Sequence, residues 1–555
     1  MQPLKPLDKL PTHDVVNMPP HIGDQDLWQD DVVLRESVIR EGGGWATKKL
    51  ARFGQLMGGD DLFHKAHMAN RYPPELKAFD RYGMRVNQVE YHPAYHDLLQ
   101  TAIENEVHSF PWTHQRTGGQ VILAALVYLF NQVEAGVMCP MAMTYAAIPA
   151  LKTTPAVADQ WIPRLLSTTY DARDVPVTAK AGATIGMFMT EKQGGSDVRA
   201  NTTRAVPIGE ARGIGAEYLL SGHKFFCSAP MCDAFLTLAH TEAGLSCFLV
   251  PRWTPDERRN ALFIQRLKDK LGNRSNASSE MELQETWGVM VGEEGRGVPT
   301  IIEMVTGTRY YCAIASTSLM RQALVRAMHH VSHRAAFGRK LIDQPLMRNV
   351  VADLALEVEA SLALTLRVGR AMDEAGQSEE AQALARIGTA VSKYYICKRT
   401  PMQIGEALEC LGGAGYIEES VLPRLYREAP LNSIWEGSGN VICLDVLRAM
   451  QREKAALPAF LAELEAARGA NGRLDNAIDA LKYELADDDN LPLRARRLTE
   501  MMAVTLQGAL LVQHAPTAVS DAFCASRLGS RWSGSFGTLP SDTDFAGIIE
   551  RITQV

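Results

Sequence analysis

The sequence predicts a mainly α-helical protein into which an antiparallel β-barrel domain is inserted. Three observations support this fold class. Apolar residues recur with helical spacing from about residue 31 to residue 150, for example at Ile122, Leu126 and Leu129. Short segments rich in β-forming residues follow between about residues 186 and 292. Helical spacing then returns, so the order along the chain is helical, β, helical.

Length and composition are those of a multidomain soluble protein. The chain has 555 residues, more than one hydrophobic core usually serves, with 46% hydrophobic and 22% charged residues. Its net charge of −7 argues against a protein that coats nucleic acid through its overall field, although a local basic patch stays open. The nine scattered cysteines form no CxxC pair, which indicates a reducing compartment. Without a signal sequence or a membrane-spanning apolar run, we expect a cytoplasmic protein.

The patterns divide the chain into five parts. Residues 1–30 are rich in Pro, Asp and His without a clear period, which is typical of an extended arm that another surface must order. A helical domain is expected over residues 31–185 and a β-domain over residues 186–292. A helical bundle over residues 293–450 and a C-terminal helical extension over residues 451–555 complete the prediction.

The β-domain prediction depends on short runs that turn residues separate. Each run is rich in β-branched and aromatic residues, and turns such as Ser221-Gly222 and Gly272-Asn273 interrupt or bound them. The expected strands are Tyr218–Phe226, Phe235–His240, Leu245–Val250, Phe263–Leu267 and Ser278–Gln284.

The second helical region begins after Gly295-Arg296-Gly297. Leu324 and Val331 share one helix face, and the same spacing continues over residues 346–369. The extension begins near Arg452, and we expect a loop inside it at residues 487–492.

The stretch from Ile434 to Asn440 carries the clearest chemical signal. Glu436 stands between an indole and a run of glycine and small polar residues. Apolar neighbours that remove water raise the proton affinity of a carboxylate, so Glu436 is a candidate base for a proton on carbon. Taken alone, a Glu before a Gly-rich turn is more often a solvated loop or helix-cap residue.

Two further stretches suit a planar ring. The turn from Met189 to Asp197 combines glycines with the hydroxyls of Thr190 and Ser196. In the expected strand Lys224–Ser228, Phe226 and Ser228 are two residues apart and therefore lie on one face, which suits stacking on a ring and bonding its edge. An ordinary polar turn and a half-buried strand would show the same patterns.

Taken together and in this order, these stretches resemble the acyl-CoA dehydrogenase superfamily from about residue 130 to residue 450. Within the superfamily the sequence is most similar to a subgroup of alkylation-response proteins, over nearly the whole chain. The matching motifs are Met189-Thr190-Glu191, Gly194-Gly195-Ser196-Asp197, Gly222-His223-Lys224-Phe225-Phe226, Arg334-Ala335-Ala336-Phe337-Gly338 with Gln344, Glu409-Cys410-Leu411-Gly412-Gly413-Ala414-Gly415-Tyr416 and Ile434-Trp435-Glu436-Gly437.

The resemblance implies an FAD enzyme in which Glu436 removes the α-proton of an acyl thioester while the β-hydride passes to flavin N5. It also implies a homo-oligomer, expected to be a dimer of dimers, because part of the FAD site comes from the partner subunit. The residues implied to contact FAD are Met189, Thr190, Ser196, Phe226, Ser228, Ser438 and Asn440, and, from the partner, Arg334, Phe337, Gln344, Glu409 and Gly413.

Two departures from the family pattern bear on the substrate. Trp435 stands where the family commonly has Tyr, and Glu409 where a Gln often binds adenine. A bulkier ring beside the base narrows the acyl pocket, so we expect a short or branched acyl-CoA, or a related small substrate.

A second function comes from the same resemblance, because the alkylation-response subgroup is associated with double-stranded DNA. Residues 441–555 contain 12 Lys and Arg against 15 Asp and Glu, whereas a DNA-binding module is normally basic. Arg494, Arg496 and Arg497 are clustered, and the first and last share a helix face. The sequence leaves two functions open, a dehydrogenase and a flavin-bearing DNA-binding protein.

The other motifs in the sequence do not predict a metal, nucleotide or hydrolase site. His329 and His333 have metal-binding spacing on a helix but no carboxylate partner in sequence, so no metal is assigned. No Walker or G-x-G-x-x-G loop occurs, and Gly194–Val198 lacks the final Gly of a nucleophile elbow. These observations argue against ATP, nicotinamide and serine-hydrolase chemistry.

Overall fold

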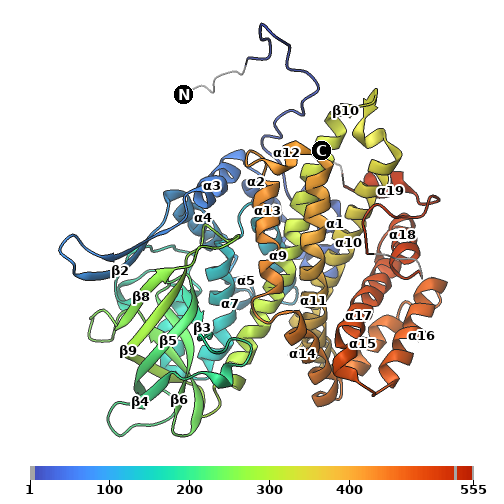
Figure 1. Cartoon of the computed structure of the whole chain (residues 1–555). Helices are drawn as coiled ribbons and strands as arrows, with labels where there is room; N and C mark the ends of the chain where they lie inside the picture. The colour runs from blue at the N-terminus through green and yellow to red at the C-terminus, as the bar shows by residue number, and fades with distance from the viewer. Residues whose placement is uncertain (1–6, 530–533, 553–555) are drawn as a thin grey trace.

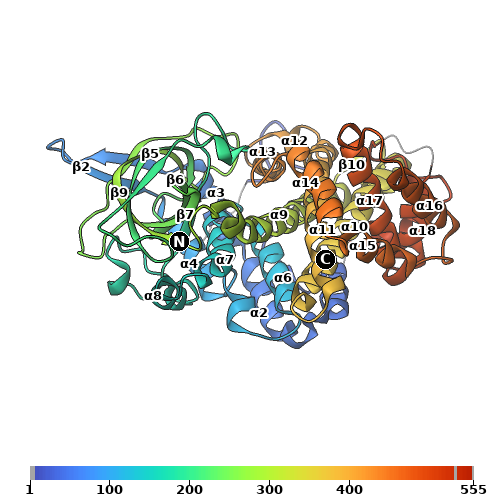
Figure 2. The ribbon, with the colours of Figure 1, turned by 90° about the horizontal axis from the view of Figure 1, so that it is seen from below.

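The computed structural model describes residues 7–529 and 534–552, so the first six residues of the predicted arm and the last three of the extension lie outside it. The barrel and the C-terminal extension lie on opposite sides of a helical centre in two perpendicular views (Figure 1, Figure 2). The predicted fold class, mainly helical with an inserted β-barrel, is confirmed.

The N-terminal region is helical, but it also contains a hairpin that the sequence analysis missed. Strands β1 (Glu75–Phe79) and β2 (Arg85–Glu90) pair antiparallel and reach out beside the barrel (Figure 1). Every residue of α6 is buried, so this helix lies in the middle of the core. The helices are α1 (Val32–Val38), α2 (Thr47–Met57), α3 (Asp60–Arg71), α4 (Pro93–Glu104), α5 (Phe110–Thr113), α6 (Gly119–Asn131), α7 (Met138–Lys152) and α8 (Pro155–Leu165).

The β-domain contains all five predicted strands and two short ones. Strands β4, β5, β9, β7 and β6 pair in this order, and the pairing of β6 with β4 closes the barrel. Most pairs are antiparallel, whereas β6 pairs in parallel with β3 and β4. The strands are β3 (Ile185–Phe188), β4 (Arg204–Pro207), β5 (Glu217–Ser228), β6 (Ala234–Thr241), β7 (Gly244–Pro251), β8 (Leu262–Leu267) and β9 (Ser278–Val291).

Helix α9 (Gly297–His333) connects the barrel to the bundle, and it packs against α6, α7, α10 and α11. A small hairpin of β10 (Ala335–Ala336) and β11 (Arg339–Lys340) follows its C-terminal end. The other bundle helices are α10 (Pro345–Glu374), α11 (Glu379–Cys410), α12 (Gly413–Tyr416), α13 (Leu422–Glu428) and α14 (Gly439–Arg452).

The C-terminal extension packs on the side of the bundle that faces away from the barrel (Figure 2). Buried Arg527 of the extension pairs with Asp353 at 2.5 Å and with Glu357 at 3.2 Å, both on α10. The predicted loop near residue 487 lies between α16 and α17. The helices are α15 (Ala456–Glu465), α16 (Gly472–Ala486), α17 (Leu491–His514), α18 (Thr517–Arg527) and α19 (Phe545–Ile549).

No helix in the described part of the chain has the length and apolar character needed to cross a bilayer. All nine cysteines are free and buried. The rings of His329 and His333 lie with centroids 4.5 Å apart and planes tilted by 41°, and His333 Nδ1 lies 2.8 Å from the carbonyl oxygen of His329.

Candidate functional site

The loop that carries Glu436 is held by cations from two long helices. Arg309 Nε on α9 donates to the carbonyl oxygen of Glu436 at 2.9 Å. Lys393 Nζ on α11 donates to the carbonyl oxygens of Trp435 at 3.0 Å and Gly437 at 2.5 Å. Three consecutive carbonyls are therefore fixed, which stabilises the left-handed backbone of Glu436 at φ 57° despite its usual cost of about 1–3 kcal/mol.

The Glu436 carboxylate is partly buried and has a defined neighbour. Thr308 Oγ1 on α9 donates to Oε2 of Glu436 at 2.7 Å. Burial raises the pKa of Glu436 above its ordinary value, and the Thr308 hydrogen bond and the nearby Arg309 and Lys393 offset only part of that rise. A carboxylate with raised proton affinity can act as a general base near neutral pH.

Trp435, next to the base, is fastened to the bundle. Its indole Nε1 donates to Asn432 Oδ1 at 3.1 Å, and Asn432 Nδ2 donates to Ser316 Oγ on α9 at 3.1 Å. The bulky ring beside Glu436 is therefore held in one orientation.

The predicted ring-binding residues of the barrel lie close to one another. The carbonyl oxygen of Thr190 accepts from Phe225 N at 2.8 Å, which joins the 189–197 turn to β5. On that strand the Phe226 side chain is 48% exposed, and the Ser228 hydroxyl lies 3.2 Å from the Ser278 hydroxyl. An open aromatic face beside a hydroxyl is suited to a planar ring.

Buried residues hold the 189–197 turn through an ion pair and hydrogen bonds. Buried Glu191 pairs with buried Lys224 at 2.8 Å and accepts from Thr203 Oγ1 at 2.5 Å. The Met189 carbonyl oxygen accepts from Asn201 at 2.9 Å, while Ser196 stays exposed at the tip of the turn.

Cys139 on α7 connects the barrel residues with Glu436. Its thiol interacts with the Ser228 hydroxyl and with Asn276, and burial, with a contribution from the charge of Glu436, raises the pKa of Cys139 to about 12. Ser228 and Glu436 therefore border the same region of the molecule. Ser438 and Asn440 lie there too, at the N-terminal end of α14.

The other predicted cofactor residues lie at the far end of α9. Arg334 follows α9 and is 26 residues beyond Thr308, which at 1.5 Å per residue is ~39 Å. Phe337 is 98% exposed, and Gln344 Nε2 donates to Ala336 O at 3.2 Å. Glu409 and Gly413 are exposed near the same end, at the α11–α12 turn. One chain therefore holds two separate groups of predicted cofactor residues.

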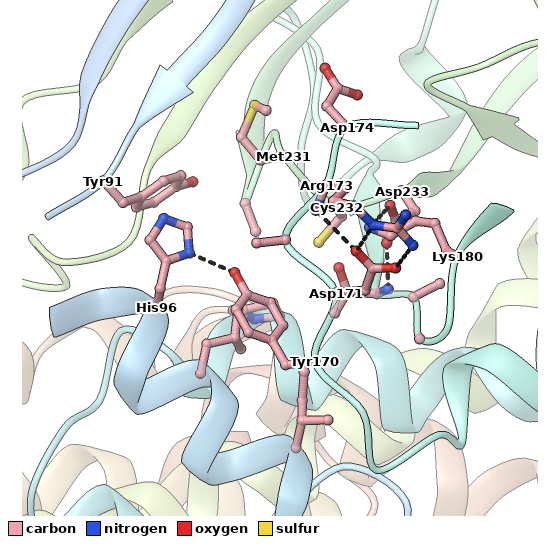
Figure 3. Close-up of a pocket in the computed structure, with 18 of the residues that line it drawn as sticks. Tyr91, His96, Tyr170, Asp171, Arg173, Asp174, Lys180, Met231, Cys232 and Asp233 are labelled. Carbon is pink, nitrogen blue, oxygen red and sulfur yellow. Dashed lines mark hydrogen bonds and ion pairs between the residues drawn. The ribbon is translucent and has the colours of Figure 1, made fainter. Parts of the chain in front are cut away.

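A cavity of about 490 Å³ lies between the N-terminal helices and the barrel (Figure 3). Tyr91, His96 and Tyr170 form its aromatic side, where His96 Nδ1 lies 2.6 Å from the Tyr170 hydroxyl. Pro140 and Ala229 also line it, and they directly follow Cys139 and Ser228 in the chain. Six of its charged residues are paired with one another as Asp171–Arg173, Lys180–Asp233 and Asp174–Arg252, and Glu90 pairs with Lys77 at 3.6 Å. The cavity therefore presents no unpaired charge from these residues, and Glu436 is not among the described residues that line it.

The three arginines predicted for DNA do not share one open face. Arg494 pairs with Glu484 at 3.0 Å and with Asp487 at 3.2 Å, and Arg497 pairs with the same Glu484. The Arg496 side chain lies instead beside Gly439 at the start of α14. If Gly439 had a Cβ atom, Arg496 Nη2 would be 3.0 Å from it. DNA binding stays a prediction.

Sequence reasoning missed Thr308, Arg309, Lys393 and Cys139. Thr308 and Arg309 precede their contacts on Glu436 by 128 and 127 residues. They lie on a helix that is buried on most sides, so no polar stripe marked them. A Thr-Arg pair inside an otherwise apolar helix segment was the only local signal.

Comparison with known proteins identifies the family. Residues 17–172 match the model of the adaptive response protein AidB N-terminal domain, and residues 186–286 and 295–451 match the acyl-CoA dehydrogenase middle and C-terminal domains. The AidB protein of Escherichia coli (strain K12) is 43% identical over 523 residues, which cover 94% of this chain and 95% of that protein. The chain belongs to the acyl-CoA dehydrogenase family.

Further relatives of this acyl-CoA dehydrogenase family member include the helical extension. Acyl-CoA dehydrogenase family member 11 of Caenorhabditis elegans is 30% identical over 501 residues, covering 84% of this chain and 80% of that one. The structure of Caenorhabditis elegans ACDH-11 in complex with C11-CoA has a TM-score of 0.85 at 26% identity and covers 96% of both chains. The Bd2924 apo-form has a TM-score of 0.82 at 27% identity, covering 90% of this chain and 99% of that one.

Proposed function

We propose that this protein is an FAD-dependent flavoprotein of the AidB-like acyl-CoA dehydrogenase group, which oxidises a short or branched acyl-CoA at its α,β bond with Glu436 as general base. The observation that carries the proposal is the environment of Glu436. Its carboxylate is partly buried and has a raised pKa, and Arg309 and Lys393 bind the carbonyl oxygens of its loop.

The chain's residues fit FAD. Phe226 offers a half-exposed ring next to the hydroxyl of Ser228, and a Cβ added at Gly195 would lie 3.2 Å from Thr190, so the turn allows only a small residue there. When bound, the flavin supplies the acceptor for the hydride that leaves the β-carbon. Thr190, Phe226 and Ser228 would hold its ring.

Glu436 takes the α-proton in this proposal. Thr308 occupies Oε2, and among the described residues no hydrogen bond engages Oε1, which leaves that oxygen for the substrate. Because the backbone is fixed on both sides of the residue, the carboxylate keeps one position relative to the barrel, as a proton transfer requires.

The acyl group is proposed to extend toward the cavity of Figure 3. Pro140 and Ala229, which follow Cys139 and Ser228 in the chain, line the cavity, and its paired charges favour an uncharged group. The relative ACDH-11 was solved with C11-CoA, which supports a thioester as the substrate class. Trp435, fixed by Asn432, supports a short or branched chain.

An oligomer follows from the same proposal. The ~39 Å of α9 between Thr308 and Arg334 exceeds what one cofactor spans, so Arg334 and Phe337 of one chain would serve the FAD of another. The 98% exposure of Phe337 supports a contact with another molecule. A dimer of dimers remains our expectation.

Anaerobic mixing with acyl-CoAs tests the dehydrogenase proposal. Short and branched acyl-CoAs should bleach the flavin absorbance, and Glu436→Gln should slow this bleaching by at least a thousandfold while keeping the flavin bound. Glu500→Gln, the same change at an exposed residue of α17, should behave as the wild type. Bleaching at the wild-type rate in Glu436→Gln would remove that residue from the reaction.

A further inference from the structure

A second cavity, of about 830 Å³, lies at the other end of α9. Residues 18–22 of the N-terminal arm, α3, the last turns of α9 and the α12–α13 segment surround it, and Figure 1 shows these elements meeting where the arm joins the molecule. Arg326 in its wall is 18 residues beyond Thr308 on α9, which corresponds to ~27 Å. The cavity is therefore separate from the Glu436 site.

The wall of this cavity is strongly basic. Five histidines and three acids, Asp60, Glu418 and Glu419, accompany five arginines in it. Two of those acids are already engaged, because Asp60 lies 3.0 Å from His21 Nε2 and Glu418 pairs with an arginine at 2.6 Å. The arginines are Arg71, Arg274, Arg326, Arg424 and Arg427.

Two half-buried arginines, Arg424 and Arg326, have no carboxylate partner among the described residues. Arg424 Nη2 donates to the Val133 carbonyl oxygen at 2.9 Å, but its buried Nη1 has no acceptor. Arg326 stacks over Phe63 at 4.9 Å and bonds the Gln322 amide oxygen when that amide is turned toward it. A buried N–H without an acceptor costs about 1–3 kcal/mol, so its presence calls for a ligand or another explanation.

The positively charged side chains of the cavity also make each other's protonated form less stable. Burial lowers the pKa of Arg326 to about 10, and the neighbouring Arg424 contributes to the same shift. Burial, with Arg424 and Arg71, lowers the pKa of His67 as well. Such a site destabilises positive charge, and a bound anion would reverse this effect.

We propose that this cavity binds a phosphate or diphosphate ester of nucleotide size, held by Arg424, Arg326 and Arg71. Arginine forks match the oxygens of phosphate groups. The volume is in the range of small-molecule sites, and Phe63, Ile22 and Leu411 offer apolar surface for the rest of the ligand. The ligand we propose is a free nucleotide, because Arg334, Phe337 and Gln344, which are proposed to meet the FAD of another chain, are not among the described residues that line this cavity.

Titration calorimetry of the full-length protein with inorganic pyrophosphate, ADP and FAD tests this proposal. Pyrophosphate and ADP should bind at one site per chain, and Arg424→Met should weaken both at least tenfold. Because Arg424 is half-buried and this variant can lose stability, Arg71→Gln is the second variant. Its side chain is exposed, and we expect a loss of threefold or more. Arg468→Gln, at an ion-paired residue of the extension, should bind as the wild type.

A comparison of flavin-loaded with flavin-free protein separates this site from the cofactor site. ADP that binds flavin-loaded protein as tightly as flavin-free protein supports a separate nucleotide site. ADP that competes with FAD, together with weaker FAD retention in Arg71→Gln, would overturn the proposal, because the cavity would then be part of the cofactor site. Equal affinities in the wild type and both arginine variants would overturn the proposal. Sulfate that binds as tightly as pyrophosphate would also overturn it, because the cavity would then hold an adventitious ion only.

Discussion

Thr308→Val should move the pH dependence of flavin reduction upward. The substitution keeps the shape of the side chain but removes the 2.7 Å hydrogen bond to Glu436 Oε2. A hydrogen bond to a charged group contributes about 1.5–3 kcal/mol, and 1.36 kcal/mol corresponds to one pKa unit, so the pKa of Glu436 should rise by about 1–2 units. Since the base must be ionised to accept a proton, the rate at pH values well below the wild-type midpoint should fall about 10–100-fold.

The measurement is the rate of anaerobic flavin bleaching at saturating acyl-CoA between pH 5 and pH 10. The rising limb reports the pKa of the base in the complex, and its midpoint should shift while the plateau at high pH changes little. Thr306→Val is the matched control, because its hydroxyl bonds the Ile302 carbonyl oxygen on the same helix and not Glu436. A midpoint that stays in place or moves down in Thr308→Val would refute the assignment of Thr308.

Three further predictions concern stability and DNA. Burial raises the pKa of Glu436 in the folded state, so unfolding releases a proton. The stability of the fold therefore falls as the pH rises above about 4.3, the pKa of a glutamate in an unfolded chain. Glu436→Gln should match the wild-type melting temperature at pH 4 and exceed it at pH 8. Lys224→Met leaves Glu191 charged and buried, and denaturant unfolding should show a loss of about 3–5 kcal/mol, part of which Lys224→Met/Glu191→Gln recovers. In gel retardation of duplex DNA at low salt, Arg496→Ala should weaken binding more than Arg494→Ala, whose charge is already paired; equal losses would contradict this order.

The sequence predicted five of the barrel strands because they are rich in β-branched or aromatic residues and turn residues bound or interrupt them. It missed the two four-residue strands β3 and β4, and it ended β9 at Gln284 instead of Val291. The β1–β2 hairpin escaped the same reasoning. Its first strand, Glu75–Phe79, has no buried residue, and four of the six residues in Arg85–Glu90 are polar or charged. Leu76 alternates with Glu75 and Lys77, but the run is short and only Val89 of the hairpin is buried, so the alternation was a weak signal. Asp80 and Gly83 at the turn were a further usable signal.

The candidate site was predicted only where its chemistry is local in sequence. Glu436 is recognisable because an indole and glycines are its immediate neighbours. Lys393 and Arg309, which hold its loop, come from helices whose surroundings are buried on nearly all sides, so hydrophobic spacing does not reveal which neighbour each faces. Such contacts depend on how helices cross, and one sequence does not encode this as a pattern.

The end of helix α9 connects the N-terminal arm with the predicted cofactor residues. Arg334, at the end of this helix, donates to the carbonyl oxygen of Asn17 at 2.6 Å, and Asn17 bonds Ala335 through both its amide nitrogen and its amide oxygen. The next arm residues, Met18 to Ile22, line the basic cavity. If Arg334 is to hold the diphosphate of a partner's FAD, it must exchange a neutral carbonyl for an anion. That exchange is favourable, because an anionic oxygen adds a Coulomb attraction to the guanidinium that a neutral carbonyl oxygen does not supply. The arm therefore occupies its present position most stably when no anion reaches Arg334.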